Sequence, residues 1–101
     1  MIDHLLSSLE ESQPPADLTP PLQALWWLKK GNLAVGPEWE RAHGICQSGE
    51  DEKAFDWIHA LAHWIEGDES NANYWYRRVG ETRSGASTDE EWRHLVTALS
   101  Q

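Results

Sequence analysis

The chain of 101 residues contains little cysteine, little basic charge and no long apolar run. Its single cysteine, Cys46, excludes an internal disulfide and suits a reducing compartment, so we expect a cytoplasmic protein. Eight basic residues stand against 17 acidic ones, a net charge of −9, which argues against nucleic acid or an anionic membrane as the partner. No apolar run approaches the ~18 residues of a membrane span, and the N-terminal residues do not resemble a signal peptide.

The alternation of apolar and polar residues that marks half-buried strands is also missing. Apolar residues instead recur at helical spacing in several segments, each bounded by proline, glycine or a capping residue. We therefore predict one all-α domain over residues 1–101, with about five to six helices. The predicted parts are an N-terminal helix and Pro-rich linker over 1–19, a first hairpin over 20–49, a second hairpin over 51–80, and a C-terminal capping helix over 87–101.

Tryptophan, in contrast, is abundant, with seven residues in this short chain. A short chain has a small core, and each tryptophan can bury about 200 Å². We expect most of the tryptophans to lie in the core. Some apolar surface would then remain for a second copy of the chain, which would allow a homodimer.

A shift of 36 residues aligns several features of the chain with one another. The aligned pairs include Gly31 with Gly67, and Trp39 with Trp75. A period of this length in a helical chain predicts stacked antiparallel helical hairpins. The matched tryptophans would then occupy related positions in two successive hairpins.

The turn of the second hairpin is similar to that of a tetratricopeptide repeat. Ala72 follows Gly67 by five residues and Tyr76 follows Ala72 by four, which is the small-then-aromatic pattern of that repeat's second helix. The first hairpin departs from the pattern because residues 32–36 contain an insertion. The fold is therefore expected to be tetratricopeptide-like, with the register of the repeat left open.

The string from Trp57 to Arg78 reads WIHAxxHxxEGDxxNAxYWYRR, and a WERAH segment begins at Trp39. Both motifs resemble those of an uncharacterised family of small helical proteins from bacteria, with relatives in fungi. The resemblance covers roughly residues 25–80 and implies a helical fold but no activity. Positions 64 and 65 are usually basic in that family, whereas this chain has Trp64 and Ile65, which puts a charge-dependent role at those positions in doubt.

Five polar residues share one side of the predicted fourth helix, at spacings of four, three, four and three: Glu52, Asp56, His59, His63 and Glu66. One interpretation is that this polar stripe is the exposed outer face of an amphipathic helix. A second is that histidines hydrogen-bond between helices in a groove, to Asp56, Tyr74 or Arg77, where a partner peptide would contact them.

A third interpretation of the stripe is a metal site. His59 and His63 lie one turn apart and could offer two imidazoles to one divalent ion such as zinc. Glu66 could add a carboxylate, and His43 a third imidazole if its helix packs alongside. The glutamate of the HExxH motif is absent, because residue 60 is alanine.

Two further groups of reactive residues have competing interpretations. Arg77 and Arg78 could bind a carboxylate or phosphate, or could simply pair with nearby acids at a helix C-terminus. Cys46 is expected to be a packed apolar side chain and not a nucleophile.

The first functional hypothesis is a non-enzymatic helical-hairpin module that binds a protein or peptide and needs no cofactor, because stacked hairpins form concave binding surfaces. Its groove would expose His59, His63, Tyr74, Arg77 and Arg78. The alternative is a metal-dependent or small-molecule site built on His43, His59, His63 and Glu66. No catalytic residue is identified in either case.

Overall fold

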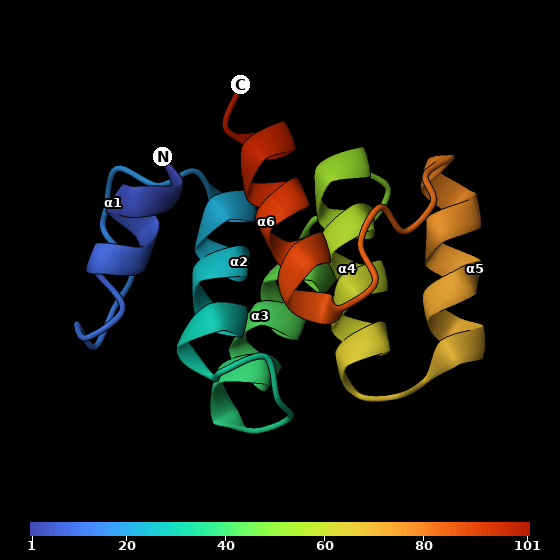
Figure 1. Cartoon of the computed structure of the whole chain (residues 1–101), viewed down its shortest axis with the longest axis horizontal. Helices are drawn as coiled ribbons and strands as arrows, with labels where there is room; N and C mark the ends of the chain where they lie inside the picture. The colour runs from blue at the N-terminus through green and yellow to red at the C-terminus, as the bar shows by residue number, and fades with distance from the viewer.

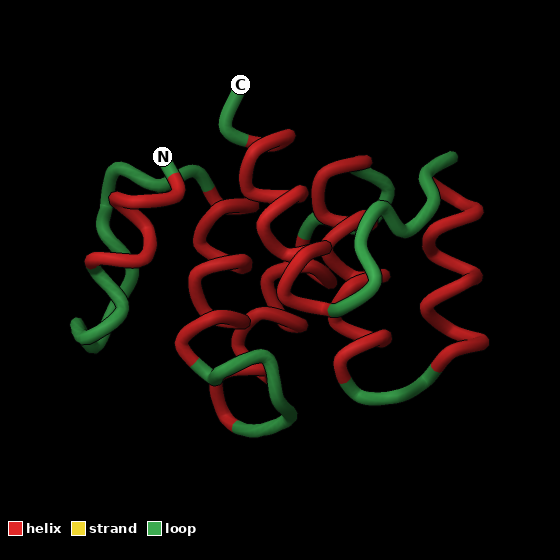
Figure 2. The backbone as a smooth tube through the Cα atoms, viewed as in Figure 1, coloured by secondary structure: helices red, strands yellow, loops and turns green.

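The computed structural model describes residues 1–101 and consists of six α-helices without a strand (Figures 1 and 2). The all-α fold and the expected number of helices are confirmed. The helices are α1 (Ile2–Ser7), α2 (Pro20–Lys30), α3 (Pro37–Ser48), α4 (Lys53–Ile65), α5 (Glu69–Val79) and α6 (Thr88–Leu99).

The helix starts follow from proline and from capping side chains. Pro20 and Pro37 occupy the first positions of α2 and α3, where a missing N–H leaves no intrahelical bond unmade. Asp68 and Ser87 each accept a backbone N–H bond at the start of α5 and α6. Thr19 precedes α2 at the capping position, but its side chain accepts no capping bond.

Successive helices pack as hairpins, α2 against α3 and α4 against α5, while α6 packs on α2 and α4. In Figure 1, α1 lies at one end of the molecule and α5 at the other, and α4 stands between them. The domain measures 33 × 28 × 27 Å. None of the six helices has the length and apolar character needed to cross a membrane.

Helix α4 is the centre of the fold and contacts α2, α3, α5 and α6. Every residue from Phe55 to His63 is buried, so the helix has no solvent-exposed face over this stretch. The interpretation of the polar stripe as an exposed outer face is therefore wrong at Asp56, His59 and His63. These polar side chains require partners inside the protein.

The tryptophans form much of the core, as predicted, since six of the seven are buried. Trp26 and Trp92 are completely buried, and their indole N–H groups are still satisfied. Trp26 Nε1 donates to Ser8 Oγ at 2.9 Å, and Trp92 Nε1 donates to the carbonyl of Leu25 at 2.8 Å. These bonds tie α6 and the N-terminal segment to α2.

One buried carboxylate organises the connection between α5 and α6. Glu91 is fully buried and accepts hydrogen bonds from the Tyr76 hydroxyl at 2.9 Å, the Ser84 N–H at 2.9 Å and the Ser84 hydroxyl at 2.8 Å. Burial, and secondarily the Glu91 charge, raise the pKa of Tyr76, so this hydroxyl remains a donor. The buried acid is thus hydrogen-bonded as its burial requires.

Candidate metal centre

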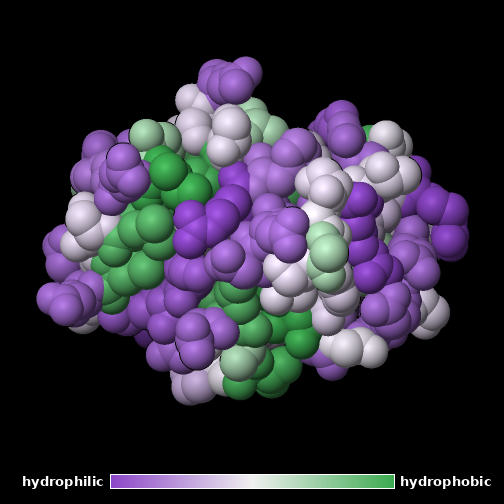
Figure 3. Space-filling model, viewed as in Figure 1, coloured by the Kyte–Doolittle hydropathy of each residue, from purple (hydrophilic) through white to green (hydrophobic).

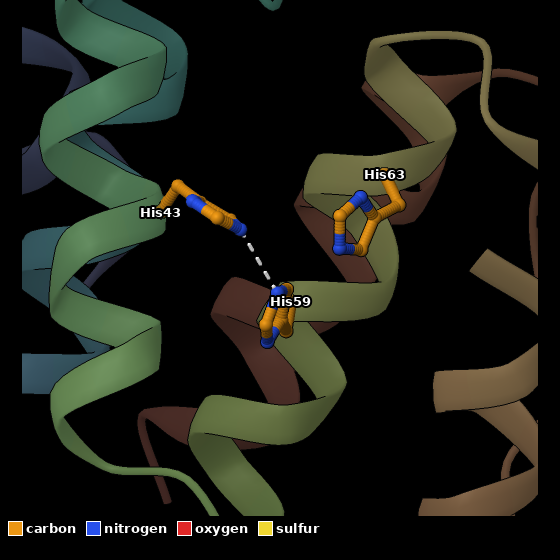
Figure 4. A group of neighbouring side chains, drawn as sticks. All are labelled: His43, His59 and His63. Atoms are coloured by element: carbon orange, nitrogen blue, oxygen red, sulfur yellow. Dashed lines mark hydrogen bonds between the residues drawn. The ribbon is translucent and has the colours of Figure 1, made fainter. Parts of the chain in front are cut away.

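Three histidines meet where α3 faces α4 (Figure 4). His43 comes from α3, and His59 and His63 come from successive turns of α4. One ring nitrogen of each lies within 4.8 Å of those of the other two. Nε2 of His43 and Nε2 of His59 are 3.0 Å apart. Two nitrogens bound to one tetrahedral zinc ion lie about 3.3 Å apart, so this pair already has nearly the spacing of two ligands.

The convergence follows from helical spacing and from the packing of α3. A separation of four residues places His59 and His63 on the same side of α4. One turn before His43, Trp39 Nε1 donates to the carbonyl of Ala62 at 2.9 Å and fixes α3 against α4. The condition set for His43, that its helix packs beside the fourth helix, is therefore met.

Two tryptophans enclose the histidines from opposite helices. The Trp39 ring stacks on His43 with ring centres 4.8 Å apart, and the Trp75 ring stacks on His59 with centres 4.3 Å apart. His59 in turn stacks on His63 at 4.7 Å. Trp39 and Trp75 are the residues matched by the 36-residue shift. These stacked tryptophan rings restrict the rotation of the imidazole rings and so hold them in position for a ligand.

Burial keeps the imidazoles of His43 and His59 neutral. Desolvation, followed by the proximity of His63 and His43, lowers the pKa of His59 to about 4. Desolvation and His63 also lower the pKa of His43. Neutral imidazole is the form that binds a metal ion. One of the two Nε2 atoms donates the hydrogen bond between His43 and His59, so that ring must change tautomer before both atoms can bind an ion.

Glu66 lies against His63 and not against the other two histidines. His63 Nδ1 is 2.5 Å from Glu66 Oε2. This contact favours the tautomer in which Nδ1 donates to the carboxylate and Nε2 keeps its lone pair. Figure 4 shows the second ring nitrogen of His63 facing the space toward His43 and His59. Glu66 is thus placed to orient a ligand.

Packing alone does not account for an imidazole at position 59. His59 is only 5 % exposed, and its Nδ1 atom is buried without a hydrogen-bond partner. A buried polar atom without a partner costs about 1–3 kcal/mol. An apolar ring stacked on Trp75 would fill the same space without that cost. The other ring nitrogen, Nε2, does have a partner in Nε2 of His43, so this polar contact and not the shape of the ring accounts for an imidazole at position 59.

The five residues of the expected groove do not share one surface. His59 and His63 are 5 % and 7 % exposed, so their expected exposure is wrong. Tyr74, Arg77 and Arg78 are exposed on α5. The histidines bond to each other and to Glu66, and none bonds to Asp56, Tyr74 or Arg77 as the groove interpretation expected.

The two arginines, Arg77 and Arg78, differ in their partners. Arg78 pairs with Asp51 and donates to the Tyr74 hydroxyl at 3.2 Å. Arg77 has no carboxylate partner, so the expectation of simple acid pairing holds for only one of them.

Cys46 is a packed side chain, as predicted. It is fully buried, and desolvation together with the Asp56 charge raises the pKa of its thiol to about 12. A thiol with such a pKa carries no thiolate at neutral pH, which excludes it as a nucleophile in this conformation.

The histidine cluster does not open into a surface hollow. Four hollows indent the protein surface, and none is lined by His43, His59 or His63. The arrangement suits the holding of an ion better than the turnover of a substrate.

No family model matches the chain, and neither a curated protein nor a solved structure matches it. The function proposed below therefore rests on the geometry of the side chains.

Proposed function

We propose that this protein binds one divalent transition-metal ion, with zinc as the first candidate, through His43, His59 and His63. The observation that carries the proposal is the convergence of three imidazole nitrogens within 4.8 Å of one another. Imidazole suits zinc, copper and nickel, and among these zinc accepts tetrahedral sites most readily. Three protein ligands leave a fourth position for water or another small ligand.

A metal ion at this position would join α3 to α4 from within. The ligands come from two helices, and α3 has only three buried side chains of its own, Trp39, Ala42 and Cys46. An ion that binds only the folded chain stabilises the fold by about 2.7 kcal/mol when the free ion concentration is a hundred times the Kd. The proposed role is therefore metal-dependent stabilisation of the α3–α4 contact, without a reaction.

Calorimetric titration of untagged protein with zinc chloride tests this proposal. We expect one ion per chain, and we expect the affinity to fall at least tenfold in His59→Asn, because one of three ligands is lost. His94→Asn and His4→Asn are matched controls, since both histidines are exposed and lie outside the cluster. Circular dichroism checks that each variant folds. Absence of saturable binding, or equal weakening by His94→Asn, would refute the proposal.

We also propose, as a second function, that the exposed face of α5 binds protein. The observation that favours it is the lack of a partner for Arg77, whose surroundings are described below. The tetratricopeptide-like character of the hairpins, a homodimer and a cytoplasmic location stay predictions from the sequence.

A further inference from the structure

We infer that the outer face of α5 binds an acidic protein segment, with Arg77 as the residue that takes its carboxylate. Arg77 is exposed on this helix, and its guanidinium makes no hydrogen bond, ion pair or ring contact within the chain. The face contains none of the clustered histidines, so the inference holds or fails independently of metal binding.

Arg77 is the exception among the basic side chains of this protein. The others have partners, which are carboxylates for Lys29, Lys53, Arg78, Arg83 and Arg93, two backbone carbonyls for Lys30, and the Trp27 ring for Arg41. With 17 acidic residues in the chain, the isolation of Arg77 is not caused by a shortage of acids. Its guanidinium is available to a ligand from outside.

Arg77 also stands between two hollows of the surface. One is lined by Tyr74, Arg77 and Arg78. The other, toward the loop after α5, is lined by Asn73, Tyr76, Arg77, Glu81, Thr82 and Arg83. Neighbouring side chains of an extended peptide could occupy the two hollows while the peptide backbone crosses α5 at Arg77.

The acids around this face already have basic partners. Asp51 and the buried Asp56 share Arg78, Glu69 pairs with Arg83, and Glu81 pairs with Lys53. The basic group without an acidic partner at the centre of the face is therefore that of Arg77. More distant acids are weakly felt, because the screening length is about 8 Å at physiological ionic strength.

The chemistry of the face defines the partner. A guanidinium binds a carboxylate through two parallel hydrogen bonds. Tyr74 is 47 % exposed and offers its ring to an aromatic or aliphatic side chain. Figure 3 shows mostly hydrophilic side chains at the end of the molecule where α5 lies. The partner is thus a glutamate- or aspartate-containing segment with an apolar residue beside the acid, and not a purely apolar helix.

Fluorescence anisotropy with a labelled, acetylated peptide of glutamates around one phenylalanine tests this inference. A matched peptide has glutamine in place of every glutamate. We expect saturable binding of the glutamate peptide alone. We expect about fivefold weaker binding to Arg77→Gln, the effect of one exposed charge pair of about 1 kcal/mol. Arg41→Gln is the control, because Arg41 is also exposed and lacks a carboxylate partner but lies on α3.

Three results would overturn the inference. The glutamate peptide shows no saturable binding at up to about 1 mM, a concentration that detects even a −4 kcal/mol interaction. Arg41→Gln weakens binding as much as Arg77→Gln does. Inorganic phosphate binds and is lost in Arg77→Gln while neither peptide binds, which would make the face a small-anion site. Arg77 is exposed and its guanidinium makes no hydrogen bond or ion pair, so loss of binding in its variant would not reflect unfolding.

Discussion

Acid should destabilise the metal-free protein before its carboxylates begin to titrate, because burial holds His59 neutral. The pKa of His59 is lowered from 6.5 to about 4 in the fold. Below pH 6.5 the unfolded chain takes up a proton at this residue that the folded chain does not. The contribution of neutral His59 to the free energy of unfolding is therefore fully present above pH 6.5 and is lost as the pH falls toward 4. His43, whose pKa is also lowered, acts in the same direction.

The size of the effect follows from the two pKa values. At pH 5 an unfolded histidine is almost fully protonated, while folded His59 is still mostly neutral. The free energy of unfolding should then be about 2 kcal/mol lower at pH 5 than at pH 7 from this residue alone. Glu69 and Asp89 have lowered pKa values, so their contributions are lost only at more acidic pH.

Urea unfolding followed by tryptophan fluorescence, with a chelator present, measures this difference at pH 7, 6 and 5. The matched control is His59→Gln, which fills similar space but does not titrate. We expect the variant to lose about 2 kcal/mol less than the wild type between pH 7 and pH 5. Equal losses in the two proteins, or a wild type that gains stability toward pH 5, would refute the account of His59 as a neutral buried imidazole.

The remaining predictions concern the neighbours of the site and the α5–α6 connection. Glu66→Gln should keep one zinc ion per chain but weaken its binding about tenfold in calorimetry, because the orienting carboxylate on His63 is lost; an unchanged affinity would show that Glu66 does not orient that ring. Tyr76→Phe should lower the free energy of unfolding by about 1.5–3 kcal/mol in urea, because buried Glu91 loses a donor. Zinc affinity should not change in Tyr76→Phe, and a parallel loss of affinity would contradict the separation of the two sites.

The sequence predicts the helices well because their ends depend on local chemistry. Pro20 and Pro37 are compatible only with the first turn of a helix, and Gly80 supplies the positive φ that ends α5. These effects act within a few residues, so periodicity and helix-end residues together are enough to place all six helices.

The burial of α4 is not predictable in the same way. Polar residues at helical spacing on α4 suggest a solvent-exposed face, because periodicity depends on residue type alone and does not show which other helices pack on that face. Here aromatic rings from two other helices, Trp39 and Trp75, cover His43 and His59. Whether His43 reaches His59 depends on the packing of α3, for which no local pattern exists. The 36-residue shift gave the only indication that the two tryptophans play related roles.

Anomalous diffraction at the zinc absorption edge, from crystals grown with one equivalent of zinc, tests the central claim most directly. We predict a single strong peak about 2.0–2.1 Å from one ring nitrogen of each of His43, His59 and His63. A peak confined to His63, Glu66 and Asp68, the other group of possible ligands on this chain, would contradict the three-histidine centre. The three-histidine centre would also be contradicted if the cluster showed no peak while zinc was bound at surface histidines such as His94.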